Sequence, residues 1–308
     1  MKKQQRRSWV MVSVLIIVAS LSGYGTSCAD PHYRQLPNLS GMAWVEDDLF
    51  IAIHDSKRNS EQFNLPRVSF LRLPKSEPQG VMWRPLHLKF PGPEGRSSDM
   101  ESAARIPGGK SFLFAESGQE GPDPRIFHAV YNDGKLQIES YIVWPVAITN
   151  VEAIAVWGAG DRMVFLYAER ADDQPSTQIR WAPLSLHPLW IGEFSEVTYY
   201  AVDPVGKGAR PVVALEIDTD SFIYIASTCD SGSNDGPYRS VVWRIGQMSV
   251  DAEGKPQVRL GDDTRVATLD GLKVESIAIR ESSESGKQVY IGTDDEHYGG
   301  IIRLLPGN

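Results

Sequence analysis

The sequence predicts an all-β fold, a β-propeller of five four-stranded blades, from three observations. A short apolar passage around a fixed alanine recurs five times, with the alanines at positions 43, 104, 155, 214 and 278, which are 61, 51, 59 and 64 residues apart. A second apolar strand follows each passage about a dozen residues later. Four strand-like runs fit between successive alanines. Strand-only repeats of this length are typical of propellers, whose blades take about 40 to 50 residues plus loops.

The strands are expected in order along each repeat. The first four repeats give strands at 42–45, 49–54, 67–73 and 81–90; at 101–106, 111–116, 125–131 and 136–144; at 152–157, 163–169, 178–184 and 197–202; and at 212–217, 222–227, 239–245 and 258–269. The sequence Asn132-Asp133-Gly134 is typical of a hairpin turn between two of them. No helix is expected. The repeated alanine and most of the strand aromatics are interpreted as packing between blades.

The fifth repeat has only three strands, at 274–279, 288–293 and 300–305. Residues 32–36 precede the first repeat, where an outer strand precedes every other repeat, so they are expected to supply the fourth strand of the last blade. Such closure joins the two termini and protects an edge that an open ring would leave unpaired. A six-bladed ring with one degenerate unit is the alternative.

Residues 1–29 are interpreted as a secretory signal and residues 30–308 as the single propeller domain. Lys2, Lys3, Arg6 and Arg7 precede an uncharged apolar run, and small residues follow it. Cleavage after Ala29 releases a secreted or periplasmic protein, whereas a lipobox-like reading of the same region places a lipid on Cys28 and anchors the protein to a membrane.

Removal of the leader would change the formal net charge from −8 to −12, because it carries four basic and no acidic residues. Nucleic acid is therefore excluded as an expected partner, since phosphate binding needs a basic surface. Cations or cationic surfaces suit this charge better. The expected partners are a small polar or phosphorylated ligand or another exported protein.

One end of the ring is predicted to carry the site. In an antiparallel blade, the start of the first strand and the end of the second strand lie at the same end of the sheet. Third strands begin at this end too, which adds three arginines to the acids that the rule gathers. The ligand-binding candidates are therefore Asp55, Arg67, Glu116, Arg125, Glu169, Arg239 and Asp295, and those expected to bind metal are Glu101, Glu152, Glu275 and Asp294.

Carboxylates gathered around a channel mouth repel one another unless a cation is present, and oxygen-rich sites of this kind suit Ca²⁺. Ca²⁺ is therefore the expected cofactor. The structural alternative is that the acids pair with arginines across their own hairpins, as Glu116 with Arg125, Glu169 with Arg180 or Arg170, and Asp230 with Arg239. The first-strand glutamates have no evident partner in the sequence. The loop 230–236 is interpreted as a polar turn, because its spacing does not match an EF-hand.

His54 and His297 follow the second strands of the first and last blades, which ring closure makes neighbours. They are the candidate catalytic residues, because histidine is the side chain that exchanges protons near neutral pH. The alternative is that both are ordinary loop histidines. Motifs of serine hydrolases, zinc proteases, nucleotide kinases and dehydrogenases do not occur.

The passages Val151-Glu152-Ala153-Ile154-Ala155 and Val274-Glu275-Ser276-Ile277-Ala278, together with the closing segment 292–303, resemble the bacterial phytase-like or "esterase-like" β-propeller group. The resemblance covers the chain from about Leu39 to its end and implies calcium-dependent hydrolysis of phosphoesters. The sequence departs from a phytase in having few lysines at the expected site, and Ser40 and Pro211 replace the glutamate in two repeats. Two functions remain open: an exported module that binds a small polar or phosphorylated ligand, and a calcium-dependent phosphoester or ester hydrolase.

Overall fold

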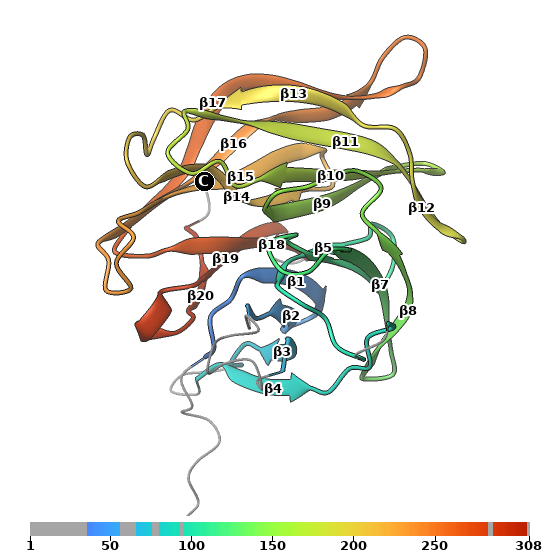
Figure 1. Ribbon diagram of the computed structural model, residues 1–308, viewed down its shortest axis with the longest axis horizontal. Coiled ribbons are helices and arrows are strands. Elements are labelled where there is room, and N and C mark those ends of the chain that lie inside the picture. Colours follow the sequence, from blue (N-terminus) through green and yellow to red (C-terminus); the bar gives the residue numbers. More distant parts are fainter. Residues whose placement is uncertain (1–35, 56–65, 76–79, 93–94, 283–285, 307–308) are drawn as a thin grey trace, which may run out of the picture. The chain divides into compact units, whose positions relative to one another are not determined.

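Five antiparallel sheets follow one another along the chain, each formed by consecutive strands (Figure 1). The computed structural model describes residues 36–55, 66–75, 80–92, 95–282 and 286–306, with the side chain of Ser282 outside that description. The predicted leader and the lipidation candidate Cys28 lie outside these residues. Among the described residues, no helix is long and apolar enough to cross a membrane.

The first three blades have the predicted strand order. The first contains β1 (Gly41–Glu46), β2 (Leu49–Ile53), β3 (Val68–Arg72) and β4 (Met82–Leu86). The second contains β5 (Met100–Arg105), β6 (Ser111–Glu116), β7 (Arg125–Asn132) and β8 (Lys135–Val143). The third contains β9 (Val151–Ala159), β10 (Arg162–Glu169), β11 (Ser176–Leu186) and β13 (Ser195–Tyr200), with the short extra strand β12 (Leu189–Ile191) paired to the far end of β11.

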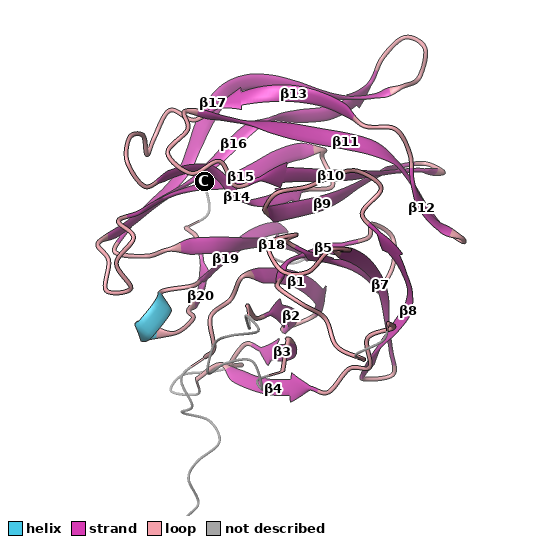
Figure 2. Ribbon diagram, in the orientation of Figure 1, coloured by secondary structure: helices cyan, strands magenta, loops and turns pink. Residues whose placement is uncertain are grey.

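The fourth blade contains β14 (Ala209–Ile217), β15 (Phe222–Asp230), β16 (Tyr238–Val250) and β17 (Pro256–Asp270), and the fifth contains β18 (Val274–Ser282), β19 (Gly286–Thr293) and β20 (Ile302–Leu304). Figure 2 shows that strands dominate, and the described residues include only a short 3₁₀ turn, η3 (Glu296–Tyr298). The all-β, five-bladed prediction is confirmed.

Local sequence explains the hairpin between β7 and β8. Asp133 and Gly134 both adopt positive φ angles, of 48° and 77°. A two-residue hairpin of this kind matches the right-handed twist of its strands, and aspartate and glycine adopt positive φ more readily than other residues. The predicted turn is therefore present where the sequence places it.

The five innermost strands surround the central axis and contact one another in the closed order β1, β5, β9, β14, β18 and back to β1 (Figure 1). The five repeated alanines are at most 3% exposed. Near the axis the backbones approach so closely that a Cβ on Gly41 would lie 2.8 Å from the backbone of Ser102. Small residues are therefore required here by packing, as the alanine repeat predicts.

The last blade is joined to the start of the described chain. The Gly300 N–H donates to the Leu36 carbonyl at 2.9 Å, and the Leu39 N–H donates to the Thr293 carbonyl at 2.9 Å. Leu39 is fully buried in a core that joins the first and fifth blades. These contacts lie at one end of the predicted closing strand, whose residues 32–35 are outside the described part of the chain.

Candidate metal centre and central cavity

A cavity of about 320 Å³ opens at the end of the ring where the innermost strands begin. Glu101, Glu152 and Glu275 stand second in β5, β9 and β18, so equivalent positions of three blades bring them to this cavity. Asp55 and Asp294, which follow β2 and β19, reach the same end. The lining consists of six carboxylates, three cations and one amide, namely Asp55, Glu101, Glu152, Glu275, Asp294, Glu296, Arg170, Arg210, Lys273 and Asn38. When all are ionised, the cavity has an excess of negative charge.

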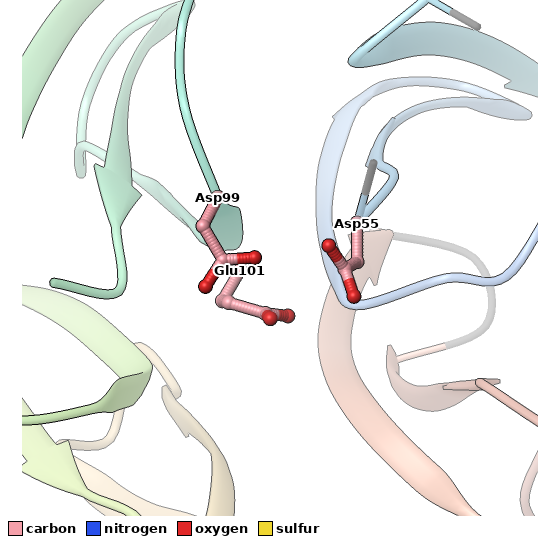
Figure 3. Close-up of side chains that lie close together, drawn as sticks. All are labelled: Asp55, Asp99 and Glu101. Carbon is pink, nitrogen blue, oxygen red and sulfur yellow. The ribbon is translucent and has the colours of Figure 1, made fainter. Parts of the chain in front are cut away.

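Three carboxylates from two neighbouring blades form an acidic group at this cavity (Figure 3). One oxygen from each of Asp55, Asp99 and Glu101 lies within 4.8 Å of the others. Asp99 is fully buried; its Oδ2 accepts a hydrogen bond from Ser117 Oγ at 2.5 Å, while its buried Oδ1 has no hydrogen-bond partner among the described residues. An unpaired buried oxygen is costly unless a cation or a proton occupies the space beside it.

Burial and like charge act together on Glu101. Burial raises the pKa of its carboxyl well above the usual range, and the charges of Asp55 and Asp99 raise it further. The guanidinium of Arg67 is also near: burial lowers its pKa, and the same two aspartates oppose that change. Three ionised carboxylates and one guanidinium leave two negative charges, which is the charge that one divalent cation balances.

The other two first-strand glutamates have cationic partners that the sequence did not reveal. Glu152 pairs with Arg170 at 2.7 Å, and Glu275 pairs with Lys273 at 3.1 Å and with Arg210 at 3.5 Å. The pKa of Glu152 is raised by burial, and the charge of Arg170 opposes this. The structure therefore places Glu101 with a metal-capable group, and Glu152 and Glu275 in ion pairs.

Lys273 is the centre of a buried ionic cluster. Its ammonium lies 2.6 Å from Glu296, 3.5 Å from Asp294 and 3.7 Å from Asp230. Burial lowers the pKa of Lys273, but the charges of Glu275 and Asp294 outweigh this and raise it overall. For Asp294, burial and the charge of Glu275 raise the pKa of the carboxyl.

The second-strand acids mostly belong to their own hairpins, as the structural alternative predicted. Glu116 receives two hydrogen bonds from the guanidinium of Arg125, at 2.7 and 3.1 Å, and Glu169 pairs with Arg180 at 3.4 Å. None of these side chains lines the cavity.

The expected pair of Asp230 with Arg239 is wrong. Arg239 binds Asp203 at 2.8 Å and Asp270 at 2.6 Å, whereas Asp230 pairs with Arg210 at 3.1 Å. Asp270 lies opposite Arg239 in the next hairpin, β16–β17, and Asp203 comes from the loop before β14, so Arg239 has two acids nearby other than Asp230.

Asp295 supports the local chain and does not line the cavity. Its Oδ1 accepts from the Lys273 N–H at 2.7 Å and its Oδ2 accepts from Thr293 Oγ1 at 2.7 Å. In the loop 230–236, the Asp230 carboxylate accepts from the Gly232 N–H at 2.8 Å, which is typical of a polar turn.

The two histidines lie in different surroundings. His54 is 2% exposed; its Nδ1 donates to the Asn38 carbonyl at 2.8 Å, and its Nε2 accepts from Ser69 Oγ at 2.7 Å. Burial lowers the pKa of His54 to about 4. His297 is exposed on η3, with Nδ1 3.2 Å from Asp235. Neither histidine lines the cavity.

Sequence reasoning missed Asp99 and Lys273, although a signal for both was present. Each stands two positions before a first-strand glutamate, and residues i and i+2 of an extended chain point to the same side. Asp99 and Lys273 therefore accompany Glu101 and Glu275 to the axis. The partner Arg170 directly follows β10 and meets Glu152 within the β9–β10 hairpin, whereas Arg210 of β14 reaches Glu275 of β18 from a neighbouring blade, which only the folded ring brings near.

No protein-family model matches the sequence, and no curated protein matches it either. Among solved structures, the chain is similar to an exo-1,5-α-L-arabinanase from a bovine ruminal metagenomic library, with 12% identity over 88% of this chain and 94% of that one and a TM-score of 0.52. It is also similar to an α-L-arabinofuranosidase from Clostridium thermocellum ATCC 27405, with 11% identity over 90% of this chain and 93% of that one and a TM-score of 0.50. At this identity the similarity shows the fold alone, and that fold is the all-β, five-bladed propeller.

Proposed function

We propose that this chain is a metal-dependent binding module, which holds Ca²⁺ between Asp55, Asp99 and Glu101 and captures a small, oxygen-rich polar ligand in the adjoining cavity. The observation that carries the proposal is the Oδ1 atom of Asp99, which is buried without a partner inside a group of three carboxylates. A cation beside this atom would satisfy it. The same cation would offset the repulsion that raises the pKa of Glu101.

The donor set favours a hard cation. All three side chains offer oxygen, and Ca²⁺ accepts six to eight oxygen ligands with flexible geometry. Three carboxylates supply between three and six of these, so coordination positions remain for water or for the oxygens of a ligand. The excess negative charge of the cavity opposes an anion by itself, which makes ligand capture dependent on the metal.

The test compares thermal melting in calcium, magnesium and EDTA for the wild-type protein, for Asp99→Asn and for the exposed control Asp161→Asn. A ligand that binds only the folded state stabilises it by about 2.7 kcal/mol at a hundredfold excess over its dissociation constant. For a domain of this size that corresponds to roughly 5 to 10 °C. We expect this shift with calcium in the wild type and in Asp161→Asn, and its loss in Asp99→Asn.

Melting that is the same in calcium and in EDTA would contradict the metal site. A calcium shift that persists in Asp99→Asn would place the ion elsewhere, with the paired acids Glu152, Glu275 and Asp294 as the next candidates.

The second candidate function is calcium-dependent hydrolysis of a phosphoester or carboxylic ester, as the phytase-like resemblance implies. The guanidinium groups of Arg170 and Arg210 border the same cavity as the acidic group. Such groups beside a bound metal stabilise negative charge that develops on an ester during hydrolysis. A panel of phosphomonoesters and carboxylic esters, assayed with and without calcium, separates hydrolysis from binding, and His54→Gln and His297→Gln test the two candidate catalytic histidines.

The arabinan-degrading activities of the similar structures are not carried over. Among the described residues, the cavity lining contains no aromatic side chain against which a sugar ring would stack. Export, with residues 1–29 as a cleaved leader or with Cys28 as a lipid anchor, remains a proposal that mass spectrometry of the mature N-terminus tests. Another exported protein as partner remains a proposal too.

A further inference from the structure

A second cavity, of about 240 Å³, lies at the opposite mouth of the ring, where the innermost strands end. All five blades contribute to it. The side chains that matter for its chemistry are Trp44 of β1, Arg105 of β5, Val156 and Trp157 of β9, Glu216 of β14 and Ile279 of β18.

The two cavities are separate. Between them lies only a small space of about 10 Å³, among Met42, Ile154, Leu215, Ile277 and other inner-strand residues. This constriction leaves no room for a ligand to extend from one mouth to the other. The second cavity is therefore a site of its own.

Glu216 places an acceptor in this cavity. Its side chain is 7% exposed, and its Oε1 accepts from the Ile217 N–H at 3.0 Å. Among the described residues, no cation lies within ion-pair distance of it and Oε2 accepts no hydrogen bond. Burial raises the pKa of Glu216 to about 8, against the lowering effects of the Ile217 N–H and the charge of Arg105. A ligand with a cationic donor group would give this carboxylate an ion-pair partner and a hydrogen bond to Oε2.

Arg105 places a donor in the same cavity. Its guanidinium stacks over the Trp44 ring at 4.3 Å, and Nε and Nη2 donate to the Gly109 carbonyl at 3.3 and 3.2 Å. These contacts fix the group, and Nη1 donates to no described residue. Arg105 and Glu216 influence each other's pKa without forming an ion pair, so each is left available to a group placed between them.

The remaining wall is partly apolar, but Asp218, Thr219 and Glu281 also line it. Asp218 pairs with Lys287 at 2.9 Å, and Glu281 accepts from the Thr219 N–H at 2.9 Å, so both acids already have partners within the protein. The indole N–H of Trp157 donates to Ser221 Oγ at 2.9 Å and that of Trp44 to the Asp47 carbonyl at 3.1 Å. Their polar atoms are therefore used by the protein, and these side chains offer the cavity apolar surface. Val156 and Ile279, which are at most 8% exposed, add aliphatic surface.

We infer that this second cavity binds a small zwitterion with an apolar side chain, the chemistry of an apolar α-amino acid. The ligand's ammonium pairs with Glu216, its carboxylate pairs with Arg105, and its side chain packs against Trp157 and Ile279. A few convergent polar groups beside apolar and aromatic surface are typical of small-molecule sites. A ligand with only one of the two charges leaves the other buried group unpaired.

The test is calorimetric titration of the full mature chain with L-leucine and L-phenylalanine, and with 3-methylbutylamine and 4-methylpentanoate, which lack the carboxylate and the ammonium of leucine respectively. EDTA is present throughout, so that the metal centre contributes nothing and the two proposals fail independently. We expect saturable binding of at least one amino acid, and binding of each single-charge analogue at least about tenfold weaker than leucine. The indole N–H resonances of Trp44 and Trp157 should shift on binding, which locates the ligand at this mouth.

The variants Glu216→Gln and Arg105→Gln should each lower affinity about tenfold or more, whereas Glu139→Gln, at an exposed position of β8, should not. Glutamine keeps the shape of Glu216 and its bond from the Ile217 N–H, so this variant should fold. The inference is overturned if neither amino acid binds at millimolar concentration, if a single-charge analogue binds as tightly as leucine, or if Glu216→Gln leaves affinity unchanged.

Discussion

Replacing Glu216 by glutamine should stabilise the folded protein, and the gain should grow with pH. The side chain is buried at the end of β14 and the groups that face it are Arg105, Glu281 and Asp218. Burial is the largest influence and favours the neutral acid; the repulsion from Glu281 and Asp218 acts in the same direction, and Arg105 opposes it.

The magnitude follows from the difference between the two states. The pKa of Glu216 is about 8 in the folded protein, against 4.5 as its ordinary value. Between these values the unfolded chain has lost a proton that the folded protein retains, so folding takes up a proton and stability falls as pH rises. Below pH 4.5 both states are protonated and nothing is lost. Each pKa unit corresponds to about 1.36 kcal/mol. The free energy of unfolding is therefore lowered by about 3 kcal/mol at pH 7, and by at most about 5 kcal/mol near pH 8.

Glutamine does not ionise, so Glu216→Gln should lack this loss. Urea unfolding of the wild type, of Glu216→Gln and of the exposed control Glu139→Gln at pH 5 and pH 8 measures the difference directly. We expect Glu216→Gln to match the wild type within about 1 kcal/mol at pH 5 and to exceed it by several kcal/mol at pH 8. If the difference in unfolding free energy between Glu216→Gln and the wild type were the same at pH 5 and pH 8, the reasoning would be refuted. The carboxyl of Glu216 would then titrate alike in the folded and unfolded states.

The remaining predictions concern the buried ions, the ring closure and the metal. Lys273→Met should lower the free energy of unfolding by about 3 to 5 kcal/mol in urea at pH 7, because Glu275 and its acidic neighbours lose the ammonium that they surround. Stability equal to the wild type would show that this cluster does not depend on its cation. A chain lacking residues 1–38 should melt well below one lacking residues 1–31, because the contacts of Leu36 with the last blade are absent, and equal melting temperatures would contradict closure. Calcium binding should release protons, because the raised pKa of Glu101 keeps a proton that the metal displaces; calorimetric enthalpies that do not vary with the buffer's ionisation enthalpy would argue against this displacement.

The blades were predictable because each is a local unit. Alternating apolar residues form the strands, Asp133 and Gly134 form a hairpin turn, and the repeated alanine marks the crowded axis. The number of blades follows from counting the repeats. The rule that antiparallel strands start and end at the same edge also predicted that Glu101, Glu152 and Glu275 would gather at one mouth of the ring, since it depends on connectivity alone.

The partners of these residues were decided by tertiary structure. Arg170 and Arg210 reach Glu152 and Glu275 from other strand ends, and Arg239 binds Asp203 and not the hairpin neighbour that the pattern suggested. Arg170 and Glu152 meet within one hairpin, but the pair of Arg210 with Glu275 depends on the distance between two blades, which no sequence periodicity contains.

The second cavity shows the same division. The sequence determined that five innermost strands would end around one mouth, and the spacing of the alanines placed Trp44 and Arg105 at equivalent positions, one residue after the alanine. Whether those side chains fill the mouth or leave a space depends on their sizes and rotamers in all five blades at once. Only the folded ring decides that Glu216 faces a cavity and that no cation of the described residues pairs with it, because all five blades contribute to the burial and charge at this mouth.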